Sequence, residues 1–345
     1  MKKLLSLVLI ALLAFSLVGA QAQGTVNVFN WEDYISEEVL ELFEQETGIK
    51  VNYMRFTLNE DMLVQVRTSP GSFDVVFPSD YAIERMMAED LLQPIDYARV
   101  PNAVQILDWL RNPDYDPGQV YSVPYMWGTV GILYDTTRVS APIDSWGALF
   151  DEQYKGEVFM LDSPRDALGV ALKYLGYSVN SKNPAEIQAA ANLLIEQKQK
   201  GIVKAYQVDE TKDKMVAGEA ALAVVWSGDA QYAINLNEDL AYVVPKEGSN
   251  VWVDSMVIPR SAPNPENAHI FINFMSRPDI AQMNAEYIEY SSPNAGAIEL
   301  MGEEYTGNPT LNPSRETVGN CEFFHDNNDV KVLYDTYWGM VKNAK

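Results

Sequence analysis

The chain has 345 residues, of which 47% are hydrophobic, so it can form one large or two ordinary domains with proper cores, and a disordered chain is excluded. Its 48 acidic and 25 basic side chains give a formal net charge of -23, which would repel nucleic acid and anionic lipid surfaces and favours a cation as partner. The alternative is that the acidic excess only keeps the surface soluble.

The N-terminal segment has the composition of a secretory signal peptide. Lys2 and Lys3 precede an apolar run from residue 4 to 18, and Ala20 and Ala22 follow with the A-x-A spacing of a cleavage site. An uncleaved membrane anchor is the alternative, but this run is shorter than the roughly 20 residues needed to span a bilayer. "LVGA" also resembles a lipoprotein signal in which Ala20 replaces the lipidated cysteine. We therefore expect residues 1–22 to be removed and the mature chain to be soluble, with no lipid attached at this point.

Downstream of the signal, short β-rich runs alternate with helical patterns. The patterns predict strands at 25–31, 50–56 and 73–79, and helices at 36–49, 59–68 and 80–92. This alternation indicates a parallel sheet with right-handed crossovers. In such sheets ligands meet the carboxyl ends of the strands and the starts of the following helices. Residues 30–33 and 78–81 occupy such positions.

The rest of the chain repeats this scheme. The patterns predict strands at 156–162 and 220–230, two strands within 240–260, and helices at 163–177, 186–199, 214–219, 264–287 and the C-terminus. No Pro/Gly/Ser-rich linker separates the two parts. We therefore expect two α/β lobes joined by extended crossings rather than independent domains on a flexible linker.

Cysteine and histidine are scarce in this chain. Cys321 is the only cysteine, so no intrachain disulfide can form. His269 and His325 are the only histidines, and they are far apart and lack a ligand-like spacing. This leaves little material for a zinc site or a histidine-based catalytic triad, and we expect no metal, no cofactor and no catalytic residue.

Aromatic and acidic residues recur together at the predicted strand ends. The pairs are Trp31 with Asp33, Tyr81 with Asp80, Trp226 with Asp229, and Trp252 with Asp254, and a fifth such position is flanked by Asp162 and Asp166. Each pair alone is more simply explained as a core-edge aromatic and a solvated acid. Their recurrence favours a cation site, because aromatic faces attract cations and carboxylates make charged hydrogen bonds to ammonium groups.

The sequence also resembles the spermidine/putrescine-binding proteins that deliver polyamines to bacterial ABC transporters. The resemblance covers nearly all of the mature chain and rests on eight stretches, which share the same order and compatible spacing. They are "FNWEDYI", "ETGIKV", "FDVVFPSDY", "YSVPYMWGT", "YKGEVFMLDSPRD", "VVWSGDA", "VPKEGSNVWVDSMVIP" and "YSSPNAGA". Each stretch alone is weak evidence for this family, but the eight together are specific to it.

The resemblance implies an α/β, two-lobed periplasmic binding protein fold of type II, with the ligand cleft between the lobes. It suggests one lobe from residues 24–129 plus about 256–301 and a second from 130–255 plus about 302–345. It further implies a periplasmic monomer that binds putrescine or spermidine and meets the permease subunits of an ABC transporter. The ligand-binding residues that we expect are Trp31, Glu32, Asp33, Ser79, Tyr81, Ser163, Asp166, Trp226, Asp229, Trp252, Asp254 and Tyr290.

Some positions depart from the spermidine-binding branch of that family. Members of this branch carry an acid at the position of Ser163, a serine at Asp229 and an amide near Phe324. Asp229 is more similar to the putrescine-preferring branch, and Glu32 stands where a small hydroxyl residue is usual. We therefore expect putrescine to bind at least as tightly as spermidine.

Two other classes of protein remain as alternatives. A binding protein of the same fold could take a sugar or an amino acid, although a sugar needs fewer acids. An amino acid would need an arginine for its carboxylate, for which Arg165 is the one candidate. A secreted glycoside hydrolase would also combine tryptophan platforms with paired acids.

Overall fold

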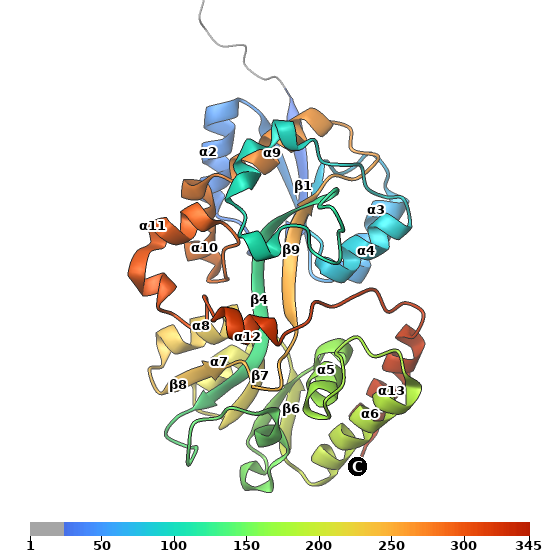
Figure 1. Ribbon diagram of the computed structural model, residues 1–345, viewed down its shortest axis with the longest axis vertical. Coiled ribbons are helices and arrows are strands. Elements are labelled where there is room, and N and C mark those ends of the chain that lie inside the picture. Colours follow the sequence, from blue (N-terminus) through green and yellow to red (C-terminus); the bar gives the residue numbers. More distant parts are fainter. Residues whose placement is uncertain (1–23) are drawn as a thin grey trace, which may run out of the picture.

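The computed structural model describes residues 24–345, so the predicted signal peptide at 1–22 lies outside the described residues. Two lobes are stacked along the long axis of the molecule (Figure 1). The strand β4, Ser122–Asp135, runs from one lobe into the other, and β9, Val251–Val257, lies beside its first half. Within the described residues, no helix is both long and apolar enough to cross a membrane.

Up to β9 the remaining elements largely alternate between strands and helices, as the patterns predict, and five helices follow β9. Those before β4 are β1 Thr25–Trp31, α2 Glu37–Thr47, β2 Lys50–Phe56, α3 Asn59–Thr68, β3 Val75–Val76 and α4 Asp80–Ala88. Those between β4 and β9 are β5 Val158–Leu161, α5 Pro164–Tyr174, α6 Pro184–Gln199, β6 Val203–Gln207, α7 Glu210–Val216, β7 Leu222–Trp226, α8 Ser227–Leu236 and β8 Leu240–Val243. The C-terminal helices are α9 Pro265–Met275, α10 Pro278–Ile288, α11 Ala295–Thr306, α12 Arg315–Gly319 and α13 Lys331–Asn343.

One continuous sheet runs through both lobes in the order β2-β1-β3-β9-β4-β7-β5-β6, and β8 also pairs with β4. Strand β1 is parallel to β2 and β3, and β5 is parallel to β6 and β7, as the strand-helix alternation predicts. Strands β4 and β9 are the exceptions, because they pair antiparallel with each other and with their other neighbours. The first half of β4 pairs with β9 and the second half with β7 and β8.

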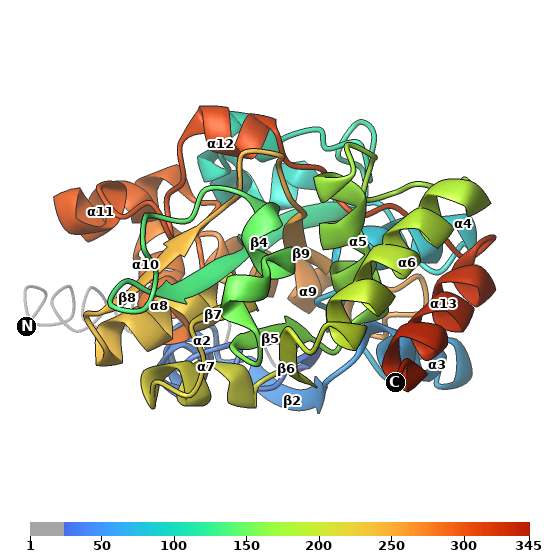
Figure 2. The ribbon, with the colours of Figure 1, turned by 90° about the horizontal axis from the view of Figure 1, so that it is seen from below.

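Separate hydrophobic cores form on the two sides of the β4 crossing. The first lobe buries side chains from β1, α2, α4, α9 and the first half of β4 around Phe29, Phe43 and Phe271. The second lobe buries one cluster around Trp146 and Leu168 and a smaller one around Phe159 and Met215. Seen from below, α5, α6 and α13 lie together on one side of this lobe and α7 and α8 on the other (Figure 2).

Several elements differ from the sequence prediction. The helix predicted at 264–287 is divided into α9 and α10, and neither β6 nor α8 was predicted. Strand β3 is confined to Val75–Val76, and the following Pro78 has no N–H to extend the ladder. The short helix predicted at 214–219 begins earlier and ends at Val216, because Gly218 has a φ of 72° that no helix interior accommodates. No strand was predicted at 122–135, where β4 is buried along its whole length and therefore lacks the alternation of a half-exposed strand.

Candidate functional site

Asp254 on β9 lies at the centre of the polar residues where the lobes meet. Its side chain is only 6% exposed, and it accepts hydrogen bonds from the Tyr34 hydroxyl at 2.9 Å and the Ser79 hydroxyl at 2.6 Å. Burial raises the pKa of Asp254 to about 6, although both hydroxyl donors act in the opposite direction. Near neutral pH the carboxylate is therefore an anion without a full counter-charge.

Ser79 and Tyr81 are held in place at the start of α4. Ser79 is the extended N-cap residue of this helix and also bridges to Asp254 in the sheet. The Asn59 side-chain amide donates to the Ser79 hydroxyl at 3.0 Å and to the Tyr81 hydroxyl at 3.1 Å. Between them, Asp80 is fully buried and one of its carboxylate oxygens has no partner among the described residues. Burial raises the pKa of Asp80, and the nearby Asp254 adds to this effect.

Aromatic rings stand beside Asp254. The rings of Trp252 and Tyr290 meet edge to face with centroids 5.0 Å apart, and Tyr34 lies 6.1 Å from Tyr290 in the same manner. Burial raises the pKa of Tyr290 well above its usual range, and the charges of Asp229 and Asp254 raise it further. Tyr290 is therefore close to both carboxylates. We call Tyr34, Asp229, Trp252, Asp254 and Tyr290 the aromatic-acid cluster.

Two glycines allow these rings to pack closely. A Cβ atom on Gly228 would lie 2.3 Å from a ring carbon of Tyr290, and one on Gly128 would lie 2.5 Å from the Trp252 ring. The indole nitrogen of Trp252 is buried and has no acceptor among the described residues. A buried N–H group without a partner is unfavourable, so the position of this nitrogen is an energetic cost of the close packing.

Asp229 comes from the second lobe, in the first turn of α8. Its carboxylate lies 3.2 Å from the Lys212 ammonium group on α7. Burial raises the pKa of Asp229, although the Lys212 charge lowers it. Trp226 ends β7 opposite Val130 of β4 and is partly buried against the core of the second lobe.

Ser163 and Asp166 form a local pair at the start of α5. The Ser163 hydroxyl donates to the Asp166 carboxylate at 2.6 Å and accepts from the Asp166 backbone N–H at 3.4 Å. Asp166 is 8% exposed, and burial raises its pKa while the Ser163 hydrogen bond lowers it. Between the two, the Arg165 guanidinium group lies 4.6 Å from the ring centre of Tyr81, a residue of α4. Arg165 therefore connects helices of different lobes.

In the part of the chain that the structure describes, the predicted site residues at the end of β1, Trp31, Glu32 and Asp33, make no hydrogen bond to the other predicted site residues. The Trp31 indole N–H donates to the Phe77 carbonyl at 2.8 Å and its ring packs 4.5 Å from Phe56. Glu32 and Asp33 are exposed, and among the described residues neither makes a hydrogen bond or ion pair with another predicted site residue. The structure thus gathers one set of predicted site residues and leaves Glu32 and Asp33 outside it. The gathered residues are Ser79, Tyr81, Asp229, Trp252, Asp254 and Tyr290.

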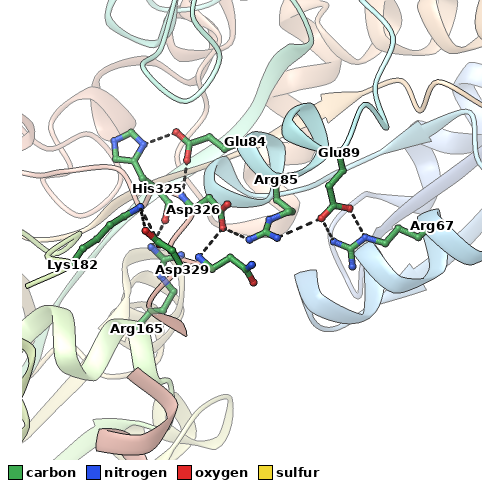
Figure 3. A network of polar contacts seen from close by, with 10 residues as sticks. Arg67, Glu84, Arg85, Glu89, Arg165, Lys182, His325, Asp326 and Asp329 are labelled. Carbon is green, nitrogen blue, oxygen red and sulfur yellow. Dashed lines mark hydrogen bonds and ion pairs between the residues drawn. The ribbon is translucent and has the colours of Figure 1, made fainter. Parts of the chain in front are cut away.

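A network of charged groups lies beside Arg165 and joins α4 to the segment between α12 and α13 (Figure 3). His325 lies 2.6 Å from Glu84, and Arg85 lies 2.8 Å from Asp326. Glu84 also accepts the Asp326 backbone N–H at 2.6 Å. Hydrogen bonds to Asp114 and Glu84 raise the pKa of His325 to about 10, so its imidazole carries a positive charge at neutral pH.

Sequence reasoning omitted Tyr34, Asn59 and Lys212 from the site. Tyr34 stands inside the quoted "FNWEDYI" stretch next to Asp33, but it was not among the aromatic-acid pairs, because its contact with Asp254 spans 220 positions of sequence. Asn59 and Lys212 carried no local signal, because a polar residue on a helix is ordinarily solvated. Among residues 24–345, no group of three His, Cys, Asp or Glu side chains is placed to hold a metal ion.

Comparisons with known proteins agree on one kind of protein. Residues 38–313 match the model of a family described as bacterial extracellular solute-binding protein. A spermidine/putrescine-binding periplasmic protein of Escherichia coli (strain K12) is 36% identical over 96% of each chain. The putrescine-binding periplasmic protein PotF of the same organism is 31% identical, over 100% of this chain and 99% of its own.

A solved structure is similar along nearly the whole chain. It is the spermidine/putrescine ABC transporter substrate-binding protein PotD from Streptococcus pneumoniae, in complex with calcium and HEPES, with a TM-score of 0.85 and 37% sequence identity. The match covers 93% of this chain and 99% of that chain.

Proposed function

The chain belongs to the family of bacterial extracellular solute-binding proteins, and we propose that it binds a polyamine, putrescine or spermidine, between its two lobes and delivers it to an ABC-type importer. The observation that carries this proposal is the buried Asp254 carboxylate among aromatic rings. Asp254 has two hydroxyl donors and no cation of the chain within ion-pair distance in the described residues. Its relatives named for polyamine binding support the same class of ligand.

A ligand ammonium group would supply the counter-charge that Asp254 lacks. Taking a charged group out of water costs several kcal/mol, which only pairing and hydrogen bonding offset. The rings of Trp252 and Tyr290 offer both apolar walls for a methylene chain and faces that attract cations, each by about 0.5–2 kcal/mol. An ammonium group near Asp254 therefore meets charge, hydrogen-bond acceptors and aromatic surface together.

The proposed binding residues include others from both lobes. Ser79 and Tyr81 would complete the first-lobe side, while Ser163, Asp166, Trp226 and Asp229 would contribute from the second. Trp31, Glu32 and Asp33 remain proposed contacts at the end of β1, where the exposed acids would have to be covered by the ligand. The proposed lobes are residues 24–129 plus about 256–301, and 130–255 plus about 302–345, a division that the separate hydrophobic cores support except at Val251, Val253 and Val318, which pack in the core of the first lobe.

The proposal includes a location and a set of partners. The protein would act in the periplasm as a monomer that meets membrane permease subunits, with no lipid attached at Ala20, and it would have no catalytic role and no cofactor. An amino-acid ligand is disfavoured because Arg165, the candidate for a carboxylate, already donates to the His325 carbonyl at 2.7 Å and stacks on Tyr81 and Phe324.

Calorimetric titration tests this function directly. Purified protein would be stripped of ligand by partial unfolding and refolding, then titrated with putrescine, spermidine, cadaverine, glutamate and maltose. We expect saturable binding of one or more polyamines and no heat from glutamate or maltose. Binding of maltose or glutamate without any polyamine would show that the ligand class is wrong.

A further inference from the structure

The ammonium group of Lys212 already pairs with Asp229, one of the carboxylates that we propose to bind the ligand. Its ammonium nitrogen lies 3.2 Å from an Asp229 carboxylate oxygen. Asp254 and Asp166 differ, because within the described residues neither has a lysine, arginine or histidine nitrogen within ion-pair distance and both are held by hydroxyl groups instead. Of these three acids, Asp229 alone is therefore paired with a cation before any ligand arrives.

The position of Lys212 is fixed by several contacts. It lies in α7, which packs against α8, and its side chain is 31% exposed. The ammonium group also lies 5.2 Å from the ring centre of Tyr232, one turn beyond Asp229 on α8. Burial lowers the pKa of Lys212, but the charges of Asp229, Asp209 and Asp213 raise it above its usual value. Lys212 thus stays charged at any physiological pH.

We infer that Lys212 is a specificity-determining residue, a resident ammonium group that limits the ligand to two charges; this inference rests on the proposed function. Asp254 and Asp166 remain to pair with the two ends of a diamine. A third ammonium group that approached Asp229 would meet Lys212 on the same carboxylate, and like charges a few ångströms apart repel strongly in a poorly hydrated site. The third charge of spermidine is then left with only the exposed acids Glu32 and Asp33, whose attraction water and salt screen, and putrescine is favoured.

The test compares how putrescine and spermidine bind to three variants. Lys212→Met removes the resident charge and keeps a helix-forming side chain of similar length. Lys212→Arg keeps the charge. Lys214→Met is the matched control, because Lys214 lies on the same helix but bonds Gln207 at 2.6 Å rather than Asp229. Each protein would be titrated with both ligands at one ionic strength, and thermal melting would confirm its folding.

We expect Lys212→Met to bind spermidine about tenfold more tightly than the wild type, with putrescine affinity changed by less than about threefold. Lys212→Arg and Lys214→Met should keep the wild-type ratio. An unchanged ratio in Lys212→Met, or an equal shift in Lys214→Met, would overturn the role of Lys212 and leave the proposed function intact. A wild type that binds neither polyamine would instead overturn the proposed function, and this inference with it.

A double-mutant cycle shows whether Lys212 acts through Asp229. In an Asp229→Asn background there is no carboxylate to release, so Lys212→Met should no longer improve spermidine binding. If the improvement persisted there, Lys212 would act as a long-range charge and not through its ion pair. That result would also contradict the inference.

Discussion

Replacing Asp254 with asparagine should weaken polyamine binding and leave the fold at least as stable. The substitution keeps the shape of the side chain and removes its charge. A hydrogen bond to a charged group contributes about 1.5–3 kcal/mol, so the loss of one ammonium contact corresponds to roughly 10- to 100-fold in affinity. Tyr34 and Ser79 keep a partner, because the amide can accept from one hydroxyl and donate to the other.

The stability of the ligand-free protein should change in the opposite direction. Burial raises the pKa of Asp254 from 3.8 to about 6, so near neutral pH the ionised form opposes folding by about 3 kcal/mol. Between about pH 3.8 and pH 6 the native state holds a proton that the unfolded state has lost, so the free energy of unfolding falls as the pH rises through this range, and near neutral pH the whole cost is present. Asp254→Asn removes this cost and should melt at the same or a higher temperature at pH 7.

Asp116→Asn provides a matched control for this experiment. Asp116 is also fully buried, but it accepts from the backbone N–H groups of Val120, Tyr121 and Ser122 and from the Ser122 hydroxyl. In asparagine, an NH₂ group would replace one of these accepting oxygens and could not accept from the N–H groups. We therefore expect the free energy of unfolding to fall by about 1–3 kcal/mol, with the affinity for putrescine unchanged. The assays are calorimetric titration with putrescine and thermal melting of the ligand-free proteins. Unchanged affinity in Asp254→Asn, or a loss of stability like that of Asp116→Asn, would refute the placement of Asp254 in the ligand site.

Other predictions concern pH and lobe movement. Putrescine affinity should fall by about tenfold between pH 7 and pH 5, because Asp254, whose pKa is about 6, takes up a proton while the ligand stays charged; titration at both values checks this, and Asp254→Asn should show no such slope. Because the pKa of His325 is raised to about 10, its contribution to stability is present below pH 6.5 and should be lost as the pH rises from there to 10. Melting curves of wild type and His325→Gln should therefore converge at high pH, and parallel curves would contradict the charged contact with Glu84. Putrescine should reduce the radius of gyration measured by small-angle scattering, since a site shared by two lobes is completed only when they meet; identical curves with and without ligand would indicate a site that needs no closure.

The sequence predicts those elements whose burial leaves a local pattern. Strands β1 and β2 and helix α3 have the predicted bounds, because their alternation or helical spacing reflects one buried face. Strand β4 leaves no such pattern, since the two lobes bury every one of its residues. Periodicity therefore does not detect the strand that connects the lobes.

The candidate site shows the same division between local and distant information. The pairing of an aromatic residue with an acid singled out Trp252 and Asp254 from local sequence alone, although both lie inside the antiparallel strand β9 and not at a strand end as predicted. The partners of these residues depend on how distant segments meet: Tyr34 reaches Asp254 from the loop after β1, and Lys212 reaches Asp229 from a neighbouring helix. A pattern of residue types reveals which acids are present, but not which of them are already neutralised.

This difference among the acids decides what kind of cation the site can hold. Asp254 and Asp166 accept hydrogen bonds from hydroxyl groups. Such a carboxylate keeps its negative charge and still lacks a counter-ion. One paired with a lysine, as Asp229 is, has little charge left to offer. Adding acids to a binding site therefore does not by itself raise the number of ligand charges that it accepts. The number depends on which acids lack a resident cation, and Asp254 and Asp166, the two proposed contacts that are both buried and unpaired, match the two ends of a diamine.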